Sequence, residues 1–169
     1  NVSAHTLKQF GETATQIIRL SINLESSLFP PGLLEHGFPS MFKEWKSSLT
    51  TFGFTLRILS TFDGNCLLTA VSEHCVILEN LYIKDRHAMF RKVQYAEYSF
   101  PQLKELIVPK LQNISSFVND AKNLTNLKVE SVANTLEFFS FDFSNIFMKL
   151  QCLQKCEIFV RTIVYQTYD

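Results

Sequence analysis

The stretch VESVANTLEFFSFDFSNIFMKLQCL, residues 129–153, decides which fold the sequence predicts. Its apolar side chains recur at intervals of three or four: Val129, Val132, Leu136, Phe139, Phe143, Ile146, Leu150 and Leu153. This spacing places them on one face of an α-helix. Within the stretch, residues 139–144 read FSFDFS, and such strict alternation also suits a strand. Because the helical spacing continues on both sides, we interpret the whole stretch as one long amphipathic helix.

Four more stripes with helical spacing precede this stretch. They run through residues 7–28, 42–59, 68–82 and 103–121. Pro101 opens the last of them, and Pro109 is expected to bend or interrupt it. The chain has only five glycines and five prolines, too few for a many-turned β-sandwich or barrel. The sequence therefore predicts an all-α fold without internal repeats: an antiparallel bundle of four main helices plus one shorter or kinked helix, in a single domain spanning residues 1–169.

The charge and the apolar content limit the partners that we expect. The 16 Lys and Arg residues balance 16 Asp and Glu residues, so there is no excess charge to attract nucleic acid. Charged residues interrupt every apolar run before it reaches the length of a membrane-spanning helix. Phe occupies 16 positions, which we interpret as core packing. The alternative is a Phe-lined cavity that holds a lipid or another apolar ligand.

The four cysteines predict disulfide bonds between helices. Cys152 and Cys156 stand one helical turn apart in KLQCLQKC, residues 149–156. We expect each of them to pair with Cys66 or Cys75, although four cysteines permit three pairings. A zinc site that adds His74 is the competing interpretation, and it is disfavoured because Cys66 and Cys75 lack the close spacing of a zinc knuckle.

Three N-x-[ST] sequons indicate an extracellular glycoprotein. They begin at Asn1, Asn113 and Asn123, and each Asn is expected in a position that would tolerate a glycan. The first residue is Asn and not Met, as in a mature chain whose signal peptide has been removed. Together with the expected disulfides, the sequons predict a secreted protein.

No catalytic motif is visible in the sequence. It contains no Gly-x-Ser-x-Gly turn, no glycine-rich phosphate loop and no His-Glu-x-x-His helix, so we expect neither an enzyme nor a bound cofactor or metal. The local concentration of positive charge at residues 84–92 is the candidate contact for a protein partner, because Arg and aromatic side chains dominate many interfaces. Its members are Arg86, Phe90, Arg91 and Lys92.

A secreted, disulfide-tied helical bundle without catalytic residues resembles the helical cytokines in outline. That resemblance implies a non-enzymatic binding protein whose partner is a receptor or another extracellular protein. A carrier of a lipid or another apolar ligand is the alternative function, and a structural or storage glycoprotein is a third. The sequence leaves the oligomeric state open.

Overall fold

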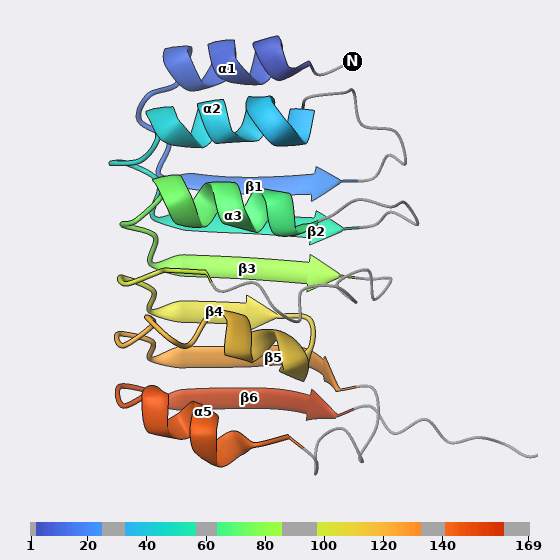
Figure 1. Cartoon of the computed structure of the whole chain (residues 1–169), viewed down its shortest axis with the longest axis vertical. Helices are drawn as coiled ribbons and strands as arrows, with labels where there is room; N and C mark the ends of the chain where they lie inside the picture. The colour runs from blue at the N-terminus through green and yellow to red at the C-terminus, as the bar shows by residue number, and fades with distance from the viewer. Residues whose placement is uncertain (1–2, 25–32, 57–63, 86–97, 133–140, 161–169) are drawn as a thin grey trace, which may run out of the picture.

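The strands of the chain form one parallel sheet, with helical segments between them, in the part that the computed structural model describes (residues 3–24, 33–56, 64–85, 98–132 and 141–160; Figure 1). Within these residues the sheet has six strands, which follow one another in chain order. They are β1 (Arg19–Leu24), β2 (Thr51–Leu56), β3 (Asn80–Asp85), β4 (Glu105–Val108), β5 (Asn126–Val132) and β6 (Lys155–Val160). The helical segments are α1 (Ala4–Thr13), the π-helix η1 (Leu33–Gly37), α2 (Phe38–Glu44), α3 (Gly64–His74), the 3-10 helix η3 (Leu111–Ser116) and α5 (Phe143–Lys149). The prediction of an all-α bundle is therefore wrong.

One sequence pattern recurs at every described strand, so the prediction that the chain has no internal repeat is also wrong. The pattern is L-x-x-L-x-L, and its last two apolar positions lie on the strand. In chain order these positions are filled by Ile17-Leu20-Ile22, Leu49-Phe52-Phe54, Leu78-Leu81-Ile83, Leu103-Leu106-Val108, Leu124-Leu127-Val129 and Leu153-Cys156-Ile158. The repeat length varies from 21 residues between Glu105 and Asn126 to 32 between Arg19 and Thr51.

The pattern agrees with the first part of the leucine-rich-repeat consensus, in which each repeat supplies one strand plus a helix or 3-10 helix. The consensus then continues with Asn or Cys, whereas this chain has Leu111 and Val132 at that place in two described repeats. The match therefore covers L-x-x-L-x-L alone. Together with the sheet order, it indicates a solenoid, in which each repeat packs on its neighbours.

A repeated set of backbone hydrogen bonds joins each repeat to the next. The carbonyl oxygen of Ile18, just before β1, accepts from the N–H groups of Thr50 and Thr51 at 3.0 and 3.1 Å. The corresponding carbonyls in the next four repeats accept in the same way; they belong to Thr50, Glu79, Lys104 and Thr125. Because the same pair of bonds recurs at each step, all six strands start in one register.

The core lies between the sheet and the layer of helical segments and is rich in aromatic rings. Fully buried side chains include Trp45 and five phenylalanines: Phe42, Phe52, Phe54, Phe100 and Phe117. The rings of Phe42 on α2 and Phe52 on β2 meet edge to face, with centroids 5.2 Å apart. The interpretation of phenylalanine as core packing is therefore confirmed for these five residues. Among the described helices, none has the length and apolarity needed to cross a membrane.

Helix α1 covers the first end of this core through close contact at Gly11. A Cβ atom at residue 11 would lie 3.0 Å from the Cα of Met41 on α2 and 3.3 Å from its carbonyl oxygen. Gly37 meets Ala4 of α1 equally closely, at 3.0 Å between the position of a Cβ and the Ala4 Cα. Both glycines therefore let the backbone of α1 lie close to that of η1 and α2.

Candidate functional site

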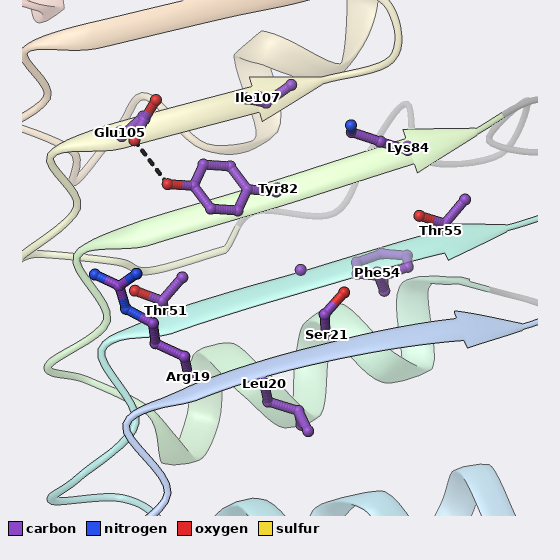
Figure 2. Close-up of a pocket in the computed structure, with 11 residues that line it drawn as sticks. Arg19, Leu20, Ser21, Thr51, Phe54, Thr55, Tyr82, Lys84, Glu105 and Ile107 are labelled. Carbon is purple, nitrogen blue, oxygen red and sulfur yellow. Dashed lines mark hydrogen bonds between the residues drawn. The ribbon is translucent and has the colours of Figure 1, made fainter.

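One face of the sheet is left uncovered by the described helices, which lie on the other face (Figures 1 and 2). Strand side chains alternate between the two faces, so the residues between the repeated apolar positions point to this open face. The parallel register arranges them in rows across the strands. The first row is Arg19, Thr51, Asn80, Glu105, Asn126 and Lys155. The second row is Ser21, Gly53, Tyr82, Ile107, Lys128 and Glu157.

A hollow of about 660 Å³ lies on the open face over strands β1 to β4. Figure 2 shows its walls: Arg19 and Ser21 come from β1, Tyr82 and Lys84 from β3, and Glu105 from β4. Its floor is Gly53 on β2, which contributes no side chain between Ser21 and Tyr82. An added Cβ at residue 53 would lie 3.5 Å from the Cβ of Tyr82, an ordinary contact. The hollow therefore exists because the second row contains a glycine.

Tyr82 and Glu105 form the central polar contact of the hollow. The Tyr82 hydroxyl donates a hydrogen bond to Oε2 of Glu105 at 2.7 Å (Figure 2). Partial burial, followed by this hydrogen bond and the negative charge of Glu105, raises the pKa of Tyr82 to about 12, and the cation of Arg19 opposes this shift. The bond fixes the tyrosine ring across the face, where one side of it borders Gly53.

We expect this raised pKa to be measurable by ultraviolet titration of the tyrosines. The folded-state pKa of Tyr82 exceeds the ordinary tyrosine value of 10.0, so its contribution to stability is present below pH 10 and is lost as the pH rises toward 12. The difference between the titrations of the native chain and Tyr82→Phe should show one phenol that ionises near pH 12. Glu105→Gln should lower that pKa, because the carboxylate charge is removed. A Tyr82 phenol that titrates near 10 would contradict the contact.

Arg19 stands at the first position of β1 and is exposed. No hydrogen bond or ion pair to its guanidinium is found within the described part of the chain. Its neighbour in the row, Thr51, accepts a hydrogen bond from Nδ2 of Asn80 at 3.1 Å. A hydroxyl has one donor and two acceptor positions, so this bond leaves the Thr51 O–H available as a donor beside Arg19.

From the edge of the hollow at Lys84 to β6, the charges of the open face contact one another. Lys84 on β3 lies 3.9 Å from Oε1 of Glu130 on β5, and Lys155 lies 2.8 Å from Oε1 of Glu157 on β6. The ammonium of Lys128 is 5.2 Å from the ring centroid of Phe159, which is half exposed. The charged side chains in this half of the face therefore contact neighbouring side chains, whereas Arg19 forms no ion pair with a described residue.

The four cysteines form no disulfide, so the prediction of a disulfide-tied protein is wrong. The fold places them at distant strands: Cys66 on α3 and Cys75 just after it precede β3, whereas Cys152 lies in the turn before β6 and Cys156 on β6. Three strand spacings separate β3 from β6, about 14 Å in all, which exceeds the span of a disulfide. The same separation removes the zinc interpretation. Within the described residues no three His, Cys, Asp or Glu side chains gather to hold a metal.

Cys75 is expected to resist thiol reagents in the folded protein. It is fully buried, and burial raises the pKa of its thiol to about 12, so almost no reactive thiolate forms near neutral pH. Cys152 is exposed and should react at once. Mass spectrometry after a short exposure to iodoacetamide at pH 8 would measure both. Rapid labelling of Cys75 in the folded chain would show that the repeat around α3 opens.

The other predicted site residues are only partly placed. Asn1 and the proposed partner-binding residues Arg86, Phe90, Arg91 and Lys92 lie outside the described residues. Asn113 lies in η3. Asn123 is exposed in the turn before β5 and donates a hydrogen bond from Nδ2 to the Pro101 carbonyl at 2.9 Å. Its use as a glycan acceptor stays a prediction.

Sequence reasoning missed the residues that line the open face, above all Arg19, Gly53, Tyr82 and Glu105. The signal that would have found them is the position between the repeated apolar residues: Tyr82, for example, stands between Leu81 and Ile83. Comparisons of the chain with protein-family models, with curated proteins and with solved structures found no match.

Proposed function

We propose that the chain is a non-enzymatic binding protein whose partner is a protein that lies across the open face of the sheet. The observation that carries this proposal is the register of that face, where side chains from successive strands form rows around the hollow over Gly53. Solenoids present such extended surfaces to partners, and Tyr and Arg, both present here, are enriched among residues that dominate binding energy.

An extracellular location remains part of the proposal, and three sequons support it. The expected disulfides no longer support it, because the cysteines form none. Treatment of protein from the native source with peptide N-glycosidase should therefore reduce its mass, and Asn123→Gln should remove one glycan's share of that change. An unchanged mass would remove the extracellular location without affecting the proposed binding face.

Photo-crosslinking at matched positions tests the binding face. Benzoylphenylalanine placed at Ile107, on the open face, should crosslink a discrete protein in a native extract. The same residue placed at Lys43, exposed on α2 in the helical layer, should not. Equal crosslinking from both positions would contradict the assignment of this face. Absence of any protein crosslink from Ile107, with a stoichiometric lipid seen by native mass spectrometry, would favour the carrier alternative.

A further inference from the structure

We propose that the hollow takes an acidic side chain of the partner at Arg19 and an apolar side chain over Gly53. This inference rests on the proposed function and gives its partner a chemistry. The occupant is an extended peptide segment that contains Asp or Glu two positions from an apolar residue.

The charge at Arg19 is available to a ligand. Glu105, the carboxylate that lines the same hollow, is on β4, three strands from β1, or about 14 Å away. These are backbone separations, and no ion pair joins the side chains of Glu105 and Arg19. Oε2 of Glu105 also accepts the hydrogen bond of Tyr82. A carboxylate at Arg19 would therefore meet a guanidinium that forms no ion pair with any described carboxylate.

Thr51 adds a second donor at the same place. Figure 2 shows its side chain and the guanidinium of Arg19 together where β1 and β2 begin. Since Asn80 already donates to Oγ1 of Thr51, the Thr51 O–H points its hydrogen elsewhere. A guanidinium and a hydroxyl donor side by side match the two oxygens of a carboxylate, which arginine binds in a bidentate manner.

The next row supplies the apolar half of the subsite. Above Gly53 the strand backbone is bare, and the ring of Tyr82 forms a wall beside it. Thr51 and Gly53 are two residues apart on β2, about 6.8 Å, which is also the distance between side chains i and i+2 of an extended peptide. A peptide that runs along β2 thus places an acidic side chain at Arg19 and an apolar one over Gly53.

Selection from a soluble library of random peptides, incubated with the immobilised full chain, tests this chemistry. We expect the bound peptides to be enriched in Asp or Glu two positions before or after an apolar residue. Loss of a charged hydrogen bond predicts that Arg19→Gln weakens their binding about 10- to 100-fold. Lys43→Gln removes a cation from the exposed surface of α2 and should change nothing.

Two further comparisons complete the test. The first tests the hollow over Gly53 independently of the Arg19 charge. The second tests whether the peptide binds through an acidic side chain or through its C-terminal carboxylate. Gly53→Val should abolish binding by occupying the space directly above the strand, where the apolar side chain of the peptide would lie, and Gly53→Ala serves as the control for folding, since its Cβ makes only ordinary contacts. Emission of the single tryptophan, Trp45, which is fully buried, reports whether each variant is folded. Each selected peptide is resynthesised with Asn or Gln for its acidic residue, and separately as the C-terminal amide. Loss with the first change alone supports a side-chain carboxylate.

The outcomes separate this inference from the proposed function. Peptides that bind in a Gly53→Val-sensitive manner, without acidic enrichment and with equal affinity for Arg19→Gln, would overturn the acidic subsite and leave the binding face intact. Loss of binding only with the C-terminal amide would overturn the side-chain assignment. Peptides whose binding neither Gly53→Val nor Arg19→Gln affects would show that the open face is not the binding surface, and would overturn both proposals.

Discussion

Replacement of Leu106 by alanine is expected to lower the free energy of unfolding by about 2–5 kcal/mol, the range for a buried leucine. The same change at the next residue, Ile107, should lower it by less, about 1–2 kcal/mol, since this side chain is only partly buried and has less apolar area to lose. Leu106 is fully buried under the helical layer, whereas Ile107 lies on the open face of β4. Urea unfolding followed by Trp45 emission would measure both changes.

This pair distinguishes a strand from a helix. The stripe through residues 103–121 places Ile107 on the same buried helical face as Leu103 and Leu111, with Leu106 off its centre. In the strand the order is reversed, because adjacent side chains point to opposite faces. A larger loss of stability from Ile107→Ala than from Leu106→Ala would contradict the position of β4 in the sheet.

The reason for the incorrect helical prediction is visible in the repeat itself. In L-x-x-L-x-L the first two apolar residues are three positions apart, which is also a helical interval. At Leu78 and Leu81 this interval leads from the end of a turn, which the Leu78 N–H closes by donating to the Cys75 carbonyl, into strand β3. The strand that follows has six residues, too few to show a clear alternation against the helical segments on either side.

Parts of the helical prediction are confirmed. The stripe of residues 68–82 begins on a real helix, since Leu68 and Val71 are buried on α3, but α3 ends at His74 and Tyr82 is on β3. Pro109, expected to kink a helix, follows the end of β4. In the stretch 129–153, the described part divides into β5, the helix α5 and a turn. Asp142, inside the alternating residues 139–144, caps α5 by accepting from the Asn145 N–H at 3.1 Å.

The residues of the open face could not be recognised one at a time, because it is the parallel register of the strands that brings their side chains together. Arg19, Thr51 and Asn80 are far apart in sequence and form one row only when three repeats align. The repeat lengths vary, so a search for a fixed period does not align them. Alignment of the repeats on the pattern L-x-x-L-x-L brings the strands into register. It places Gly53 beside Tyr82 and Arg19 beside Thr51 without any knowledge of the helices.

The largest single effect is expected from Phe52→Ala, about 3–5 kcal/mol for a buried phenylalanine. Phe52 is fully buried on β2, and its ring meets that of Phe42 on α2 at 81°. A domain is stable by only about 5–15 kcal/mol, so this variant should be near the limit of folding at 37 °C. Phe159→Ala on β6 is the matched control: its ring is half exposed, so the loss should stay near 1 kcal/mol. Circular dichroism in increasing urea would measure both.

A double-mutant cycle with Phe42→Ala then tests whether the helical layer and the sheet are coupled through these rings. Edge-to-face pairs contribute about 0.5–1.5 kcal/mol beyond their buried area. The sum of the two single losses in unfolding free energy should therefore differ from the loss in the double variant by this amount. Since Phe42 lies on α2 and Phe52 on the strand that follows it, their coupling measures how firmly the helix is held on the sheet. Additive losses at these two residues would show that α2 does not pack on β2 through this pair.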